Sequence, residues 1–209
     1  MCGRYMFMLE KNDEIIELLE QLEAETYERK VKTGEIRPTD QALILISTDQ
    51  GIIPAAGIWG FPQFNGKGVL INARSETAFE KKTFRDSMID RRCIVPSTGF
   101  YEWDAGKRQY LFNMEGDKVL YLAGLYNFYK GELRYVVLTT EANESVREIH
   151  DRMPVIIPRQ EITAWLTDQQ ASAELMRRTP PQLAKTVKSS GKGTGRGNYG
   201  QQYRMDLWP

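Results

Sequence analysis

Apolar and polar positions follow two different periods along the chain. Between residues 13 and 30 the apolar side chains recur with the spacing of one helix face, and Asn12 or Asp13 is suited to cap that helix. These side chains are Ile15, Ile16, Leu18, Leu19 and Leu22. Short runs rich in Val, Ile, Leu, Tyr and Phe follow, separated by Gly, Pro and Asn-Gly or Glu-Gly turns, as is typical of strands. We expect strands at 42–47, 57–60, 69–73, 93–96, 100–103, 110–114, 119–129 and 133–140.

Helical stretches interrupt these strands without strict alternation. They are predicted near 76–90, 144–150, 161–166 and 172–178. A doubly wound sheet requires a regular strand–helix order, so the pattern favours an α+β fold with a mostly antiparallel, barrel-like β core and peripheral helices. No internal repeat or boundary divides the chain, and we predict a single domain over residues 1–209 with a flexible Gly- and Ser-rich tail at 189–209.

Composition narrows the class of protein. The 209 residues include 41% hydrophobic and 11% aromatic residues, enough for a proper core. No run has the length of a membrane helix and no signal pattern opens the chain, so we expect a cytoplasmic protein that does not bind membranes. In that compartment Cys2 and Cys93 are expected to be free thiols. One histidine and no C-x-x-C pair argue against a metal site, and no cofactor is expected.

The net charge is zero, but the charges are unevenly placed. Residues 10–28 are strongly acidic, whereas residues 177–204 carry seven basic and no acidic side chains. Such a basic segment could hold phosphates while an acidic helix faces away from them. The alternative is a solvated helix and a basic tail without a partner.

The second residue offers unusual chemistry. Aminopeptidases remove an initiator Met when a small residue follows, so the mature chain would begin at Cys2. Its amine and thiol would then lie on adjacent carbons, with ordinary pKa values of about 8 and about 8.5. Such an aminothiol condenses with an aldehyde to an imine, and the thiol closes a thiazolidine ring; alternatively the thiol is a nucleophile with the amine as its base. On its own, a cysteine at this position is more simply explained as having no role.

Three further segments carry candidate chemistry. Asn72 and Arg74 follow an apolar strand, Glu102 is flanked by aromatic residues, and His150 is the only histidine. With Cys2 they would supply a nucleophile, two proton-transfer groups and an amide, if the fold brings them together. Each also has a structural explanation: a strand-ending Asn, an exposed carboxylate and a helix-ending His.

Eight separated motifs give these segments a common context. They are MCGRY (1–5), RPT (37–39), WGFP (59–62), INARSET (71–77), RRCIVPSTGFYEW (91–103), AGLY (123–126), TTEAN (139–143) and IHDRMPVII (149–157). In content and order they resemble the SRAP (SOS response-associated peptidase) family through about the first three quarters of the chain. The C-terminus departs from the family, which commonly carries a Val-Asn-rich segment where this chain reads TVKSSGKGTGRG.

The resemblance implies a DNA-damage function. Family members bind single-stranded DNA and trap abasic sites covalently, and this chain is expected to do so as a monomer that joins the nucleoid when bound to DNA. By resemblance Cys2 forms the thiazolidine, and Asn72 forms a hydrogen bond with the opened sugar or with the new linkage. Glu102 shuttles protons, while His150 positions the sugar oxygen or phosphate and assists reversal. The implied activity is abasic-site crosslinking with lyase-type chemistry. The family name adds a peptidase (hydrolase) activity by which the protein would remove its own Met1, with an aminopeptidase as the alternative.

The resemblance also implies a DNA surface. Three arginines are expected to hold phosphates, and three further residues to stack against or wedge apart the bases. The arginines are Arg4, Arg74 and Arg152, and the stacking residues are Pro38, Trp59 and Phe61. For Trp59 a place in the core is an equal alternative.

Two other functions remain open at this point. Class II glutamine amidotransferases also begin Met-Cys-Gly, although the further glutamine-binding segments of that class are missing here. A non-covalent reader of single-stranded DNA or modified bases would leave Cys2 without a role.

Overall fold

The computed structural model describes residues 2–8, 13–25, 31–64, 66–116 and 119–188. Its centre is a barrel in which each strand pairs with the next and the last strand returns to the first. In order around the barrel the strands are β11 (Leu120–Tyr129), β8 (Arg92–Ser97), β3 (Gln41–Thr48), β4 (Gly51–Trp59) and β12 (Glu132–Glu141). All neighbours are antiparallel except β4 and β12, which are parallel. The predicted α+β fold with a mostly antiparallel barrel is therefore confirmed.

Strand β12 is longer than its barrel pairing requires and continues into the region of the site. Beyond the barrel its second half pairs with β7 (Asn72–Arg74) on one side and β13 (Arg152–Pro154) on the other. A separate antiparallel sheet has the order β14 (Ala184–Lys188), β10 (Gln109–Asn113), β9 (Gly99–Trp103), β1 (Tyr5–Phe7) and β2 (Gly34–Ile36). A short hairpin pairs β5 (Phe61–Pro62) with β6 (Val69–Leu70).

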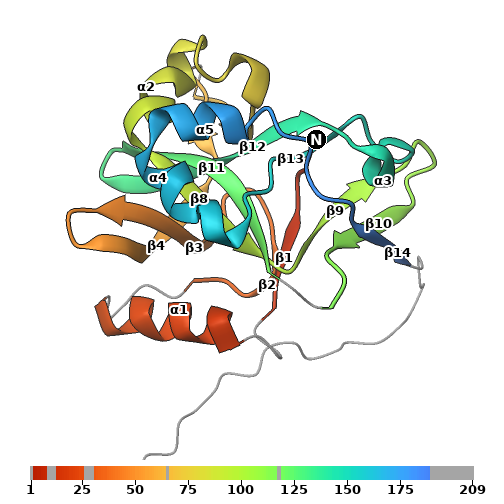
Figure 1. The fold of residues 1–209 in the computed structure, drawn as a ribbon, viewed down its shortest axis with the longest axis horizontal. Coiled ribbons are helices and arrows are strands. Elements are labelled where there is room, and N and C mark those ends of the chain that lie inside the picture. The colour runs from red at the N-terminus through yellow and green to blue at the C-terminus, as the bar shows by residue number, and fades with distance from the viewer. Residues whose placement is uncertain (1, 9–12, 26–30, 65, 117–118, 189–209) are drawn as a thin grey trace, which may run out of the picture.

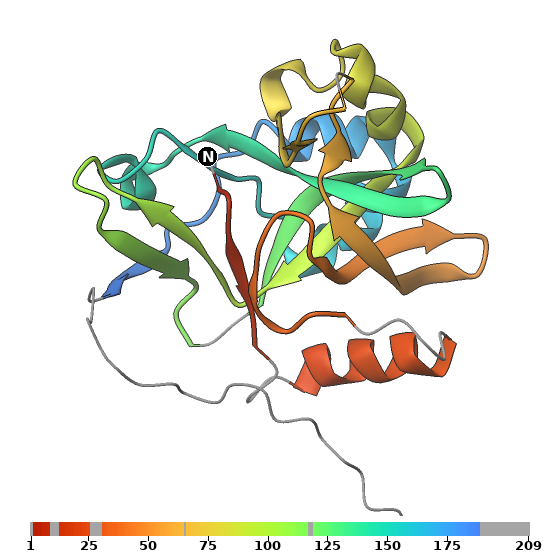
Figure 2. The same ribbon diagram turned by 180° about the vertical axis from the view of Figure 1, so that it is seen from behind.

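Helices cover the barrel on two sides (Figures 1 and 2). On one side lie α2 (Lys82–Asp90), α4 (Ile162–Thr167) and α5 (Gln169–Leu175), and on another α1 (Asp13–Glu25) runs beside the β3–β4 hairpin. The short helix α3 (Glu144–Arg147) lies at the opposite end from that hairpin, near β9 and β10. Single 3₁₀ turns occupy Ser75–Thr77 and Arg159–Glu161.

The core follows from the period-two alternation of the strands. In β12, Leu133, Tyr135 and Val137 join a buried cluster that also contains Cys2, whereas Val136 and Leu138 join a second cluster beneath the helices. Both faces of this strand are thus buried, which explains why it reads as an almost continuous apolar run.

Several elements differ from the sequence prediction. The expected helix at 76–90 begins as a 3₁₀ turn and becomes α-helical only at Lys82, and β4 is much longer than the expected 57–60. Strands β1, β2, β13 and β14 were not predicted; the first three are only three residues long, too short to show a period. The flexible tail predicted at 189–209 lies outside the described residues.

Candidate active site

Cys2 enters the core at the start of the second sheet. The backbone N–H of Tyr101 in β9 donates to the Arg4 carbonyl oxygen at 2.9 Å, which extends the β1–β9 pairing toward the start of the chain. Cys2 is completely buried, and its thiol donates to the same Arg4 oxygen at 3.6 Å. Burial raises the pKa of the Cys2 thiol well above its usual value, and the negative charge of Glu102 raises it further. The thiol therefore stays protonated at neutral pH.

Asn72 holds the backbone of Cys2. It is the first residue of β7, where it pairs with Val137 of β12, so its backbone is fixed by the sheet. Its side-chain Nδ2 donates to the Cys2 carbonyl oxygen at 2.8 Å. Its Oδ1 is buried and has no hydrogen-bond partner within the described residues. A buried acceptor beside Cys2 is thus available to a ligand.

Glu102 is a buried carboxylate in the middle of this group. It lies on β9 and is 2% exposed, and its Oε2 is 4.0 Å from Nε2 of His150. Burial raises the pKa of Glu102 to about 7. Near neutral pH both of its protonation states are therefore populated, which suits a group that must accept and return a proton.

His150 faces Glu102 from a turn that follows α3. Its backbone N–H donates to Val146 O at 3.0 Å, and its Nδ1 accepts the backbone N–H of Arg152 at 3.0 Å. Burial lowers the pKa of His150, so the neutral ring is favoured and its proton lies on Nε2, the nitrogen toward Glu102. Asp151 lies 3.0 Å from Nδ1 and would favour the opposite tautomer, but its side chain is 86% exposed. The hydrogen bond from the Arg152 N–H to Nδ1 therefore determines the tautomer.

The gap between Glu102 and His150 is itself informative. At 4.0 Å the two side chains do not form a direct hydrogen bond. An oxygen atom beside them could lie at about 2.8 Å from both, within ordinary hydrogen-bond distance. At this spacing both side chains can contact the same small polar group.

Arg152 is buried next to this pair. Its guanidinium forms two hydrogen bonds with the Glu76 carboxylate, at 2.6 and 2.8 Å, and a third with the Thr139 carbonyl at 2.6 Å. The two bonds from Arg152 to Glu76 also lower the pKa of Glu76. Contact between Arg152 and a DNA phosphate, as predicted, would require the phosphate to displace Glu76.

The other two predicted phosphate ligands are more accessible. Arg74 ends β7 and is exposed. Arg4 lies over the ring of Trp103 at 4.9 Å and pairs with Glu35 at 3.4 Å, with about a third of its side chain exposed. Both flank the site, because Arg4 is two residues from Cys2 and Arg74 is two residues from Asn72.

Two predicted stacking residues lie in the core, which for Trp59 is the alternative that the sequence left open. Trp59 is fully buried: its Nε1 donates to Ile71 O at 2.9 Å, and its ring stacks on Tyr135 with the centroids 6.4 Å apart. Phe61 is also fully buried and packs against Phe84 and Tyr129. A large apolar ring without access to solvent cannot stack on a base. The third predicted residue, Pro38, is half-buried after β2 and remains a prediction.

Sequence reasoning missed a different aromatic residue. Phe64 is fully exposed in the loop of the β5–β6 hairpin. The signal was present in the sequence QFNGKG, where a single aromatic residue stands in a polar, Gly-rich turn with no apolar partner nearby. An exposed aromatic ring at a loop tip is a better stacking candidate than either buried ring.

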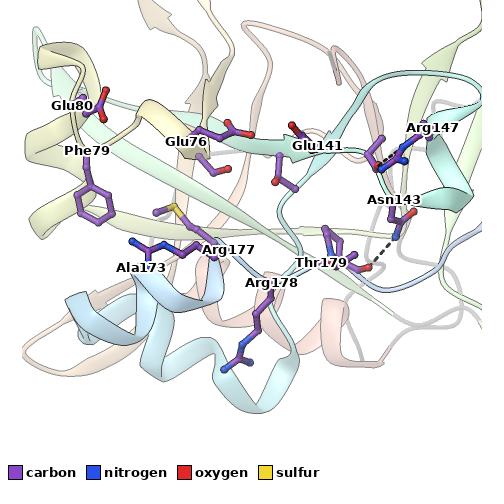
Figure 3. Close-up of a pocket in the computed structure, with 15 residues that line it drawn as sticks. Glu76, Phe79, Glu80, Glu141, Asn143, Arg147, Ala173, Arg177, Arg178 and Thr179 are labelled. Carbon is purple, nitrogen blue, oxygen red and sulfur yellow. Dashed lines mark hydrogen bonds between the residues drawn. The ribbon is translucent and has the colours of Figure 1, made fainter.

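A polar cleft of about 550 Å³ lies beside the site rather than in it (Figure 3). Its walls come from the 3₁₀ turn at Ser75–Thr77, the end of β12 and the residues after α5. Glu76, the ion-pair partner of Arg152, is part of the wall, but Cys2, Asn72, Glu102 and His150 are not. The cleft therefore adjoins the site through the Glu76–Arg152 pair and through Asn143, the cap of α3.

Two kinds of feature are absent from the described residues. In that part of the chain no three His, Cys, Asp or Glu side chains are grouped to hold a metal ion. None of its helices is long and apolar enough to cross a membrane.

Comparison with known proteins gives this arrangement a context. Residues 1–190 match the family model "SOS response associated peptidase (SRAP)". The chain is similar to the abasic site processing protein YoqW of Bacillus subtilis, with 30% identity over 84% of each chain. It is also similar to the abasic site processing protein YedK of Escherichia coli, with 26% identity over 83% of each chain. A crystal structure of a Bacteroides thetaiotaomicron protein has the same fold, with a TM-score of 0.74 and 23% identity over 89% of this chain and 91% of that one. The chain belongs to the SRAP family.

Proposed function

We propose that this protein forms a covalent adduct with abasic sites in single-stranded DNA through Cys2, after loss of Met1. The observation that carries the proposal is the grouping of Cys2, Asn72, Glu102 and His150, four residues separated by up to 148 positions in the sequence. The names of the relatives support the substrate, because they are called abasic site processing proteins and resemble this chain over most of its length.

The proposed reaction uses both functional groups of Cys2. Its α-amine adds to the C1′ aldehyde of the ring-opened sugar, and water leaves to give an imine. The thiol then adds across the C=N bond: a carbon–sulfur bond forms, and the thiol proton is carried to the nitrogen. The product is a five-membered thiazolidine ring. Because the buried thiol is protonated, the amine reacts first and the thiol needs a base for the second step.

Glu102 is the proposed carrier of that proton. It is close enough for its charge to act on the thiol, and with a pKa of about 7 it can both take and release a proton. Together with His150 it could bind the sugar hydroxyl or the departing water between the two side chains. We expect Glu102→Gln to slow adduct formation by about 10²–10⁴-fold, the usual contribution of a general acid–base group.

The remaining residues hold the substrate. The free Oδ1 of Asn72 is available to a hydroxyl of the opened sugar, while its Nδ2 keeps Cys2 in place. Arg74 and Arg4 are suited to bind the flanking phosphates, which gives affinity without sequence preference. Phe64 is the proposed stacking residue in place of Trp59 and Phe61.

Loss of Met1 is part of the proposal. The thiazolidine needs the free amine of Cys2, so active protein must lack Met1. Self-removal with the help of Glu102 is the peptidase reaction that we propose. Intact mass spectrometry tests it: retention of Met1 in Glu102→Gln but not in wild type supports self-removal, whereas loss in both assigns the step to an aminopeptidase. Active protein that retains Met1 would refute the thiazolidine mechanism.

A denaturing gel of the protein mixed with abasic single-stranded DNA tests the function. Wild type should give a heat-stable adduct. Cys2→Ala should give none, although an imine to its free amine could be trapped with borohydride. Cys93→Ser is the matched control and should still form the adduct, because Cys93 is buried in β8 with its sulfur against the backbone of Gly124. A stable adduct of Cys2→Ala without borohydride, or none with folded Cys93→Ser, would identify another nucleophile.

Two alternative functions are tested alongside. Ammonia release from glutamine would indicate an amidotransferase. Equal, purely non-covalent binding of abasic and intact single strands would indicate a reader for which Cys2 has no role.

A further inference from the structure

Glu102 and His150 come from different parts of the fold. Glu102 lies on β9 of the second sheet, whereas His150 lies between α3 and β13, next to the long strand β12 of the barrel. Their 4.0 Å separation therefore depends on what joins these two parts of the protein near the site. A buried side chain, Asn143, makes such a connection.

Asn143 organises the turn that carries His150. It is 5% exposed and caps α3: its Oδ1 accepts the backbone N–H of Ser145 at 3.0 Å and the Ser145 hydroxyl at 2.6 Å. One turn later the backbone N–H of His150 donates to Val146 O. The position of His150 thus follows from the position of this short helix.

The other half of the Asn143 carboxamide reaches a distant segment. Its Nδ2 donates to the carbonyl oxygen of Pro180 at 2.9 Å (Figure 3). It also donates to the carbonyl oxygen of Pro181 at 2.8 Å, so both of its hydrogens are used. The Ser145 hydroxyl also accepts the backbone N–H of Leu183 at 3.1 Å. Three bonds therefore join the cap of α3 to residues 180–183.

Residues 180–183 lead directly to the sheet that holds Glu102. The next residue, Ala184, begins β14, which pairs with β10 along its whole length. Tyr110 of β10 lies opposite Val187 of β14 on one side and opposite Glu102 of β9 on the other. A continuous set of hydrogen bonds thus runs from His150 through Asn143 to Glu102.

We propose that Asn143 is a positioning residue that sets the distance between His150 and Glu102 by joining α3 to the segment before β14. This inference rests on the proposed function of the site. It differs from a role in helix capping alone, because capping needs only Oδ1, whereas positioning also needs the two bonds from Nδ2.

Asn143→Asp separates the two roles. Aspartate caps a helix as well as asparagine does and keeps the acceptor for Ser145, but it has no hydrogens for the two proline carbonyls. Asn143→Ala removes both functions. A displacement of about 1 Å in a reacting group can slow a reaction about 10²-fold, so we expect both variants to form the DNA adduct about 10- to 100-fold more slowly. Lys185→Ala is the control, since it removes an exposed ion pair with Glu148 between the same two segments.

The single histidine of the chain allows a measurement without DNA. Its ring signals in an NMR titration belong to His150 without further assignment. In the described residues the ring faces Glu102 from β9, and Asp151 and the Arg152 N–H from its own turn. When Asn143→Ala loosens this turn, water should reach the ring and its pKa should rise toward the ordinary value of about 6.5. Lys185→Ala should leave the titration unchanged.

The outcomes separate this inference from the proposed function. Folding of each variant is first checked by circular dichroism, and Asn143→Asp, which keeps the cap, carries the test if Asn143→Ala does not fold. A wild-type rate of adduct formation in Asn143→Asp, or a wild-type titration of His150 in folded Asn143→Ala, would overturn the inference. Failure of the wild-type protein to form any adduct would refute the proposed function, while the titration would still decide the role of Asn143.

Discussion

Replacing Glu102 by glutamine should stabilise the protein at alkaline pH while impairing its chemistry. Glu102 is 2% exposed, and burial raises its pKa from the ordinary 4.5 to about 7. Its raised pKa means that the folded state holds this proton more tightly than the unfolded state does. The resulting stability is fully present below pH 4.5 and is lost as the pH rises through 7. Glutamine has nearly the same shape and carries no charge at any pH.

The magnitude follows from the shift. One pKa unit corresponds to about 1.4 kcal/mol, so at pH 8 the ionised carboxylate lowers the free energy of unfolding by about 3 kcal/mol. At pH 5 the same calculation gives about 1 kcal/mol or less, because the unfolded carboxyl group is then only partly ionised. The stability difference between Glu102→Gln and wild type should therefore grow by about 2 kcal/mol from pH 5 to pH 8.

Urea unfolding at the two pH values, followed by tryptophan fluorescence, measures this difference. Glu141→Gln removes one exposed carboxylate from β12 and controls for the change in net charge. The reasoning is refuted if the Glu102→Gln difference is the same at both pH values, or if the variant is the less stable protein at pH 8. Either result would mean that Glu102 is solvated or firmly paired as an anion in the folded state.

Three further predictions concern the DNA. Arg74→Ala should weaken binding to single strands uniformly across sequences. It should also reduce the slope of the logarithm of the binding constant against the logarithm of the salt concentration by about one, as measured by fluorescence anisotropy in a salt series. His150→Ala should slow release of the adduct more than its formation, as measured by gel assays in both directions; equal effects would argue against a role in reversal. Phe64→Ala should weaken binding without changing the melting temperature, whereas Trp59→Ala should destabilise the fold by about 3–5 kcal/mol; the opposite pattern would restore Trp59 as the stacking residue.

The sequence predicted the fold class because the long elements have clear periods. The β3, β11 and β12 segments were recognisable as long apolar runs, and α1 as a stripe with helical spacing. Strands β1 and β13 were not, because three residues do not define a period. These short strands nevertheless begin next to Cys2 and His150, so the least predictable elements are those that build the site.

The candidate catalytic residues were identified by residue type and motif, but their environment required the structure. The aromatic residues of the run GFYEW suggest partial burial of Glu102, but only the structure shows that Glu102 is 2% exposed and faces His150. The same limit explains the error at Trp59 and Phe61, since an aromatic residue in a motif can serve either the core or a ligand. Whether a ring is covered depends on partners such as Tyr135, which is 76 positions away from Trp59.

The burial of Cys2 also affects how well its thiol resists oxidation. Oxidants that damage DNA attack thiolates most readily, and exposed, ionised cysteines are the first to be lost as sulfenic or sulfinic acids. A thiol that is fully covered and held in its protonated form reacts slowly with such oxidants and with soluble disulfides. The burial that keeps the thiol unreactive before a substrate enters would therefore also protect it from oxidation during oxidative stress.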